Sequence, residues 1–202
     1  LKVVPGFMFN PLDDVDLDHE LKALGDEIVV KPSEGGSSLG LHFVKGKQQI
    51  RNHLEGLPHG DWIIEKRIQG REMSVGILNG KALGVVEILP KSGDYDYDSK
   101  YTNGLTDYEY PARITEKMHT AITSAAEVIF RACSCRDFAR ADFILKENGK
   151  RWEVFLLEIN TLPGMTENSL LPMSAMCTGR DFDGLVSEML APAIGRFQKK
   201  WA

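Results

Sequence analysis

The chain has 202 residues, of which 43% are hydrophobic and 26% are charged, and its formal net charge is −5 at pH 7. A chain of this size can bury the core of one globular domain or of two small lobes. The acidic balance argues against a nucleic-acid partner, because such proteins usually carry a basic face. No apolar run reaches the roughly 18–20 residues of a membrane-spanning helix, so we expect no membrane partner.

The first half of the chain predicts short strands interrupted by glycine-rich turns. Residues 27–32 are β-branched and stop at a proline, which indicates a buried strand. The Gly/Ser-rich stretch 33–40 follows, then a strand at 41–44, a short helix at 47–56 and a strand at 61–68. Residues 72–89 form a hairpin, because Asn79-Gly80 is a strong hairpin-turn signal.

The second half begins with a polar segment, 91–111, that contains all five tyrosines. A segment this long without regular structure is typical of a lid or a binding loop. A helix is expected after Thr115, and a second hairpin spans 138–160 around Asn148-Gly149. Asp181 should cap a last amphipathic helix, which Pro192 should kink or interrupt. Hairpins dominate this order of elements, so the predicted fold class is α+β with mainly antiparallel sheets.

The three cysteines indicate the redox compartment of the protein, and the first residues indicate where its natural chain begins. An odd, low cysteine count indicates a reduced, intracellular protein. Cys133 and Cys135 could form a metal pair, but tight thiolate sites usually have four ligands, so we expect structural cysteines. The chain starts at Leu1 in the middle of a strand-like pattern, and we therefore expect the natural chain to begin earlier.

The second hairpin carries the strongest pattern for a chemical site. Residues two apart on a strand share a face, so Glu158 and Asn160 point the same way, as do Arg140 and Asp142. The turn at 148–149 can bring the two pairs together. Two carboxylates and an amide oxygen suit Mg²⁺ with phosphates and waters. The alternative is a cross-strand Arg140–Glu158 salt bridge with Asp142 in solvent.

Two further stretches indicate phosphate and nucleotide contacts. Lys31 ends a buried strand just before the Gly/Ser-rich stretch, whose backbone N–H groups could approach an anion closely. The stretch is not a P-loop and could be an ordinary turn. The peptide groups of 66–68 could contact an adenine edge, with Glu65 or Glu72 on ribose hydroxyls. Here the alternative is a strand that runs into a charged turn.

Taken together, these motifs follow the order of the ATP-grasp superfamily. The sequences "KPSEGGSSLG", "YDYDSKY" and "LEINTLPGMTENSLLP" resemble the D-alanine–D-alanine ligase family, and the resemblance covers nearly all 202 residues. It implies an α+β ATP-grasp fold, with two lobes of mainly antiparallel sheet that sandwich the nucleotide. The smaller lobe would be 1–68. The larger would be 69–202, with the lid 91–111 and the Mg²⁺ site. The family's N-terminal substrate domain is absent.

The resemblance also implies roles for individual residues. Ser37, Tyr101, Arg140 and the Gly164 N–H would be the catalytic groups, with Ser37 and Tyr101 holding the lid. ATP would be contacted by Lys31, Glu65, Arg67, Ile68, Glu72 and Lys100. Two Mg²⁺ ions, or Mn²⁺, would be bound by Asp142, Glu158 and Asn160. The second D-alanine's carboxylate would be held by Ser169 and Leu170.

The implied activity is ATP-dependent joining of two D-alanines through an acyl phosphate, for peptidoglycan precursors in the cytoplasm. The full-length protein would be a homodimer with small-molecule substrates. Tyr101 favours an amine as the second substrate. The absent N-terminal domain makes ATP and Mg²⁺ binding better supported than turnover by this chain alone. The alternatives are another ATP-grasp carboxylate–amine ligase and a non-catalytic nucleotide-binding domain.

Overall fold

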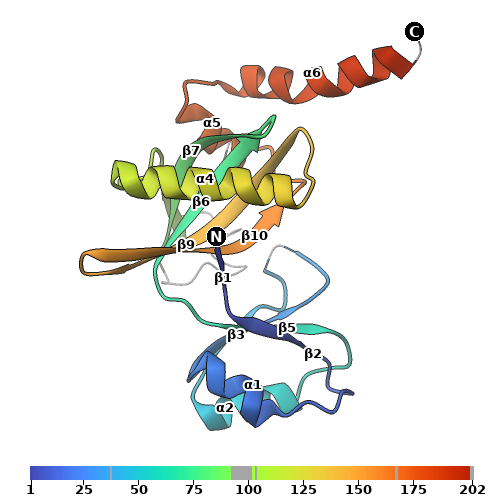
Figure 1. Ribbon diagram of the computed structural model, residues 1–202, viewed down its shortest axis with the longest axis vertical. Helices are drawn as coiled ribbons and strands as arrows, with labels where there is room; N and C mark the ends of the chain where they lie inside the picture. Colours follow the sequence, from blue (N-terminus) through green and yellow to red (C-terminus); the bar gives the residue numbers. More distant parts are fainter. Residues whose placement is uncertain (37, 92–101, 103, 167, 201–202) are drawn as a thin grey trace. The chain divides into compact units, whose positions relative to one another are not determined.

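A computed structural model describes residues 1–36, 38–91, 102, 104–166 and 168–200 (Figure 1). The chain forms two compact units. The larger unit contains Leu1–Val3, Gly70–Leu89 and Asp107–Ala202, and the smaller unit contains Val4–Gln69 and Pro90–Thr106. This division differs from lobes 1–68 and 69–202 in placing Leu1–Val3 in the larger unit and Gln69 and Pro90–Thr106 in the smaller.

The smaller unit is a four-stranded antiparallel sheet with two helices. The strands run in the order β2 (Gly6–Phe9), β5 (Trp62–Lys66), β3 (Glu27–Pro32) and β4 (His42–Lys45). The helices α1 (Leu17–Leu24) and α2 (Lys47–Glu55) cover one face of this sheet (Figure 1). The core between them consists of Phe9, Leu24, Ile28, Val30, Ile50, Leu54, Trp62 and Ile64.

Side chains alternate between the two faces of the sheet along β3 and β5, and this alternation decides which of them face away from the core. Ile28 and Val30 are fully buried against the helices. Val29 and Lys31 alternate with them and therefore belong to the opposite face. Glu65 belongs to the same face, because Val29 is its partner in the β3–β5 ladder. The face of the smaller sheet opposite α1 and α2 thus carries both a lysine and a carboxylate.

The larger unit is a six-stranded sheet with helices on both faces. Its strands run in the order β1 (Lys2–Val3), β10 (Arg151–Asn160), β9 (Phe138–Asn148), β6 (Arg71–Leu78), β7 (Lys81–Pro90) and β8 (Thr106–Glu109). The β10–β9, β9–β6 and β6–β7 pairs are antiparallel, whereas β1 and β10 are parallel.

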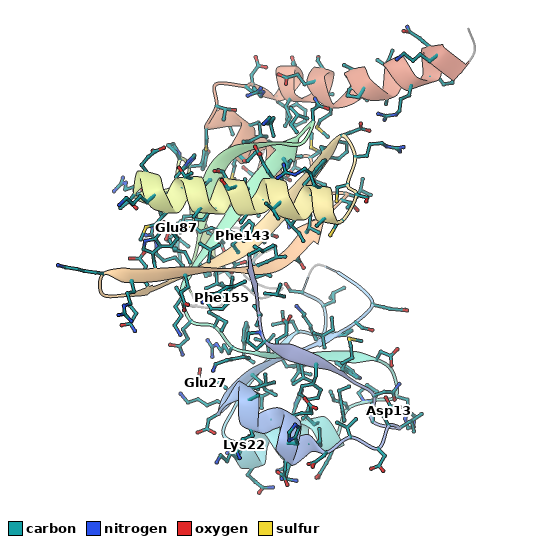
Figure 2. The ribbon with its side chains drawn as sticks, viewed as in Figure 1. Asp13, Lys22, Glu27, Glu87, Phe143 and Phe155 are labelled. Carbon is teal, nitrogen blue, oxygen red and sulfur yellow. The ribbon has the colours of Figure 1, made fainter. Side chains whose placement is uncertain are left out.

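Helix α4 (Glu116–Ala132) covers one face of the larger sheet (Figure 1). Its Ile122, Ala126 and Phe130 pack on a core that includes Phe143, which Figure 2 labels. Helices α5 (Leu170–Met176) and α6 (Phe182–Lys200) belong to a second cluster with Leu78 and Leu83. Because Gly76 alternates with the residues that face α4, its contact with α5 places α5 on the other face.

Most predicted elements are confirmed, with two corrections. Residues 106–109, expected to be irregular, form β8 at the sheet edge, where pairing supplies backbone hydrogen bonds. Pro192 does not interrupt α6, which continues from Phe182 to Lys200. The predicted caps are present: Thr115 accepts a hydrogen bond from the N–H of Met118, and Asp181 from that of Gly184.

The apolar face of α6 is only partly used for packing. Leu185 and Met189 are buried in the second cluster, but Leu190 and Phe197 are 53% and 67% exposed. No helix among the described residues is long and apolar enough to cross a membrane.

Candidate functional site

The ladder between β9 and β10 brings the predicted metal ligands together. Asp142 pairs with Glu158, and Arg140 pairs with Asn160. Residues that pair directly across an antiparallel ladder have side chains on the same face. All four side chains therefore belong to one patch, on the face opposite α4.

A one-residue irregularity in β10 creates this arrangement. From the turn up to the Leu156–Phe143 pair the register is constant, and continued unchanged it would set Glu158 opposite Ala141. The register shifts between Leu156 and Glu158, so Leu157 is the extra residue of a β-bulge. The residues of β10 that pack on the α4 core show the same switch, because they are Trp152, Val154, Leu156 and then Ile159.

Asp142 is the most constrained member of the patch, with a residue exposure of only 5%. It accepts a 2.7 Å hydrogen bond from the hydroxyl of Ser74 on β6. The guanidinium of Arg140 donates to it from Nε and Nη2, at 3.0 and 2.8 Å. Ser74 was not predicted as a site residue, because only the β6–β9 pairing shows that it lies opposite Asp142.

Glu158 and Asn160 are more accessible than Asp142. The Glu158 side chain is 54% exposed, and its Oε1 lies 3.9 Å from Nη2 of Arg140. The alternative of an Arg140–Glu158 salt bridge with a solvated Asp142 is correct only in part: the cross-strand ion pair is present at 3.9 Å, but Asp142 is buried and is the nearer partner of Arg140. The amide oxygen of Asn160 accepts a hydrogen bond from the N–H of Leu162.

This donor set fits Mg²⁺. Within the described residues, no three His, Cys, Asp or Glu side chains converge in a group that could hold a metal ion. The β9–β10 patch offers two carboxylates and an amide oxygen instead. Mg²⁺ is usually bound in proteins through one or two carboxylates, with phosphates and waters as the remaining ligands.

The segment after β10 leads from this patch to α5. Ser169 is the N-cap residue of α5, and Leu170, its first helical residue, is buried. The Ser169 hydroxyl accepts a hydrogen bond from the N–H of Thr166 at 3.0 Å. A Cβ added at Gly164 would lie 2.9 Å from the Ser169 Oγ. Glycine at 164 therefore allows the backbone to pass close to Ser169.

Helix α5 is attached to the sheet by a buried serine. The Ser174 hydroxyl accepts from the N–H of Gly76 on β6 at 2.9 Å and donates to the carbonyl of Gly84 on β7 at 2.5 Å. The β6–β7 ladder is irregular between Val75 and Ile77, so Ser174 satisfies backbone groups at this irregularity. A Cβ at Gly84 would lie only 2.1 Å from the Cβ of Cys177.

The smaller unit holds the predicted phosphate and nucleotide residues. Lys31 Nζ lies 2.7 Å from Glu65 Oε2, and both side chains are mostly buried. Gly6 on β2 leaves room for Glu65, because a Cβ there would lie 2.8 Å from Glu65 Cγ. The structure therefore joins a predicted phosphate ligand and a predicted ribose ligand in an ion pair on the face opposite α1 and α2.

The end of β5 is held by backbone and charge contacts. The N–H of Arg67 donates to the carbonyl of Glu27 at 3.0 Å, and its guanidinium lies 4.8 Å from the ring centroid of Phe43. The Lys45 ammonium beside Glu27, at 2.5 Å, lowers the pKa of that carboxyl below its ordinary value. Ile68, the next residue, is half-buried.

The remaining predicted residues fall into two groups. Glu72 lies on β6 in the larger unit and pairs with Ile144 and Ile88. Ser37, Lys100 and Tyr101 lie outside the described residues. All three cysteines are free thiols, with Cys133 exposed.

Comparison with known proteins identifies the family. Residues 9–191 match the family model described as the C-terminus of D-ala D-ala ligase. The chain belongs to this family. The D-alanine–D-alanine ligase of Syntrophotalea carbinolica is 42% identical over 168 residues, which are 82% of this chain and 54% of the relative. That of Aquifex aeolicus is 45% identical over 161 residues, 79% of this chain and 54% of the relative. The chain thus spans about half the length of these relatives.

Solved ligase structures share the fold. The D-alanine–D-alanine ligase of Bacillus anthracis complexed with ATP has a TM-score of 0.79 and 27% sequence identity, covering 100% of this chain and 63% of that one. The VanG D-Ala:D-Ser ligase of Enterococcus faecalis has a TM-score of 0.78 and 28% identity, over 95% of this chain and 57% of that one. The predicted α+β, ATP-grasp fold class is confirmed.

Proposed function

We propose that this chain is the ATP-binding portion of an enzyme that joins two D-alanines with cleavage of ATP to ADP and phosphate. The observation that carries the proposal is the Asp142–Glu158 pair beside Arg140 and Asn160 at one end of the β9–β10 ladder. This donor set suits an ion that binds nucleotide phosphates, and it lies in a chain that belongs to the ligase family.

In the larger unit, Asp142, Glu158 and Asn160 would hold Mg²⁺ or Mn²⁺. The bound ions would neutralise charge on the phosphoryl oxygens. Asp142 holds the Arg140 guanidinium in a fixed orientation through two hydrogen bonds. Arg140 and the Gly164 N–H would donate to the oxyanion of the tetrahedral intermediate, which requires preorganised donors.

In the smaller unit, Lys31 would contact the ATP phosphates, and its Glu65 partner keeps the ammonium in place before ATP binds. The peptide groups of Arg67 and Ile68 would contact adenine. Glu65 and Glu72 would accept hydrogen bonds from ribose hydroxyls. Lys100 would contact phosphate.

The proposed reaction has two steps. The carboxylate of the first D-alanine attacks the γ-phosphorus of ATP and releases ADP, which leaves an acyl phosphate. The amine of the second D-alanine then attacks the acyl carbon, and phosphate leaves. Ser169 and Leu170 would hold the second D-alanine's carboxylate, and Ser37 and Tyr101 would hold the lid that excludes water.

A second candidate is ligation of D-alanine to a different second substrate. The VanG neighbour, a D-Ala:D-Ser ligase, is as similar in fold and identity as the solved D-alanine–D-alanine ligase of Bacillus anthracis. Both candidates keep the acyl-phosphate chemistry and differ only at the acceptor. The peptidoglycan role, the homodimer and the cytoplasmic location belong to the same proposal.

The decisive experiment fuses this chain behind the part of the Syntrophotalea carbinolica ligase that it does not match. Phosphate release from ATP should depend on D-alanine, with L-alanine, D-serine and D-lactate as comparison substrates. Preference for D-serine as acceptor would support the second candidate. Phosphate release that is independent of every D-amino acid would contradict both.

Titration of the 202-residue chain with ATP tests the binding part separately. We expect binding in the presence of Mg²⁺, and its loss in the double variant Asp142→Asn, Glu158→Gln. Both substitutions preserve side-chain size but remove the negative charge and replace one acceptor oxygen with an N–H donor, so the loss would report the need for two carboxylate ligands. Unchanged Mg²⁺-dependent binding in the double variant would show that the metal assignment is wrong.

A further inference from the structure

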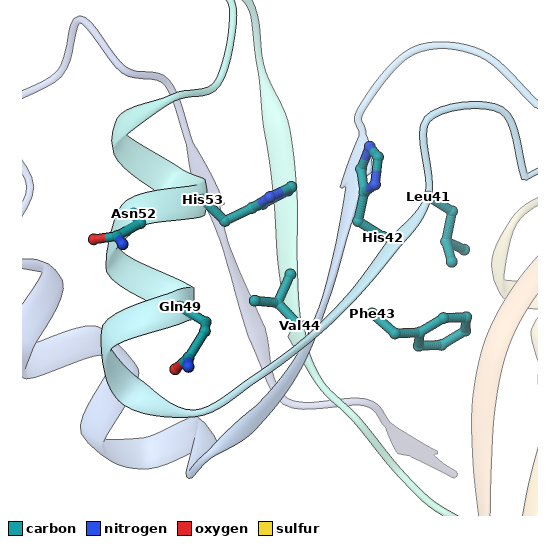
Figure 3. A pocket seen from close by; sticks show the side chains of 7 residues that line it. All are labelled: Leu41, His42, Phe43, Val44, Gln49, Asn52 and His53. Atoms are coloured by element: carbon teal, nitrogen blue, oxygen red, sulfur yellow. The ribbon is translucent and has the colours of Figure 1, made fainter.

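A groove in the smaller unit lies between the edge strand β4 and helix α2, with a volume of about 600 Å³ (Figure 3). Two histidines lie in it: His42 on β4, and His53, which extends from α2 toward it. Their ring centroids are 4.9 Å apart, and the rings are inclined at 60°. The remaining lining residues are Leu41, Phe43, Val44, Gln49 and Asn52.

His53 has an unsatisfied ring nitrogen. Its Nε2 is buried and has no hydrogen-bond partner, and no other buried side-chain nitrogen or oxygen in the described part of the chain shares this property. The neighbouring Asn52 accepts a hydrogen bond from Gln48 through its amide oxygen. A buried polar atom without a partner is unfavourable, so a group that binds this nitrogen would stabilise the groove.

We propose that His42 and His53 bind one divalent transition-metal ion, of the class of Zn²⁺ or Ni²⁺. At metal–nitrogen distances of about 2.0–2.1 Å, two imidazoles on one tetrahedral or square-planar ion have centroids roughly 4.5–5.2 Å apart. The observed 4.9 Å lies in this range. Imidazole nitrogen suits these ions, whereas Mg²⁺ and Ca²⁺ take oxygen ligands.

The surroundings of the two rings favour a metal over an anion. Burial lowers the pKa of His53 below its ordinary value, with a smaller contribution from the nearby His42. His42 is exposed on an edge strand. Its ring can therefore turn about the Cβ–Cγ bond and admit an ion. Water would complete the coordination.

The ion would connect two elements that the fold otherwise joins only weakly. β4 is the last strand of its sheet and pairs with β3 alone. A ligand from β4 and one from α2 would fix this edge strand to the helix. The proposed site is separate from the β9–β10 patch, which belongs to the larger unit, and does not depend on the proposed ligase function.

Calorimetric titration of the 202-residue chain with NiCl₂ at pH 7.5 tests the proposal. All variants carry Cys133→Ser and Cys135→Ser, which removes the neighbouring thiols of the larger unit as competing donors. We expect one Ni²⁺ per chain. His42→Ala and His53→Gln should each weaken binding by at least the roughly 10–100-fold that loss of a supporting group around a metal ligand causes.

His59→Ala is the matched control, because His59 is exposed and does not line the groove; it should bind Ni²⁺ like the parent. In the unsubstituted chain, Zn²⁺ should also change the ¹⁵N chemical shifts of the imidazole nitrogens of His42 and His53, and not those of His19 and His119. Absence of stoichiometric binding, a loss confined to one of the two groove variants, or an equal loss in His59→Ala would overturn the proposal.

Discussion

Glu158 lies opposite Asp142 because the β9–β10 ladder shifts by one residue at Leu157. Without the shift, Glu158 would share a face with Leu156 and would point into the core under α4. The bulge therefore converts a strand that packs on a core into one that presents two carboxylates on the other face. Bulges often occur next to active sites for this reason.

Insertion of one alanine between Leu157 and Glu158 should remove Mg²⁺-dependent ATP binding. The insertion would move Glu158 from its place opposite Asp142 to the one opposite Ala141, toward the apolar core. We also expect a loss of several kcal/mol of stability, because an unpaired charge would be buried. ATP titration and urea denaturation measure the two effects. Deletion of Leu157 is the control, because it removes only the extra residue of the bulge, leaves Glu158 opposite Asp142 and should retain binding; equal losses in both variants would show that the register is not the cause.

Ser74→Ala should destabilise the larger unit. It removes the 2.7 Å hydrogen bond to the buried Asp142, and loss of one partner of a buried polar group costs about 1–3 kcal/mol. The free energy of unfolding in urea measures the change. Ser187→Ala, at an exposed position of α6, is the control and should stay within roughly 0.5 kcal/mol of the parent.

Two glycine substitutions should change the stability of the larger unit in opposite directions. Gly84→Ala would set a Cβ 2.1 Å from that of Cys177, so α5 must move; overpacking of this kind costs about 1–3 kcal/mol or more. Gly195→Ala lies in α6 with no atom within 4 Å of the added Cβ. It should stabilise by about 0.5–1 kcal/mol, because alanine favours the helix. Thermal unfolding of the two variants checks the prediction, and a stable Gly84→Ala would contradict the close packing of α5.

The Asp137–Arg196 pair should contribute to stability in a pH-dependent way. Arg196 binds both carboxylate oxygens of Asp137 and lowers its pKa below the ordinary 3.8. A carboxyl whose pKa is lower in the folded state contributes stability above its unfolded pKa and loses it as pH falls through the folded pKa. The stability difference between the parent and Arg196→Gln, measured by urea denaturation, should therefore be full at pH 7 and shrink below about pH 3.8. A difference that is constant down to pH 3 would contradict this reading.

The sequence by itself determined most of the strands, the two hairpins and the residue types of the β9–β10 patch. Alternation in 27–32 and the turn signals at Asn79-Gly80 and Asn148-Gly149 depend on local backbone preferences, which are written in neighbouring residues. The grouping of Arg140 and Asp142 with Glu158 and Asn160 was predicted correctly. However, a regular hairpin would have separated Asp142 from Glu158, and the bulge that unites them was not predicted.

Only the tertiary structure decided the partners that hold these groups. Ser74 contacts Asp142, and Ser174 contacts Gly76 and Gly84, across 68, 98 and 90 positions of sequence. The order of strands in the sheet sets such contacts, and no local pattern encodes that order. The face on which Glu158 lies depends in the same way on the ladder with β9, because a strand's register is fixed by its partner as well as by its own residues.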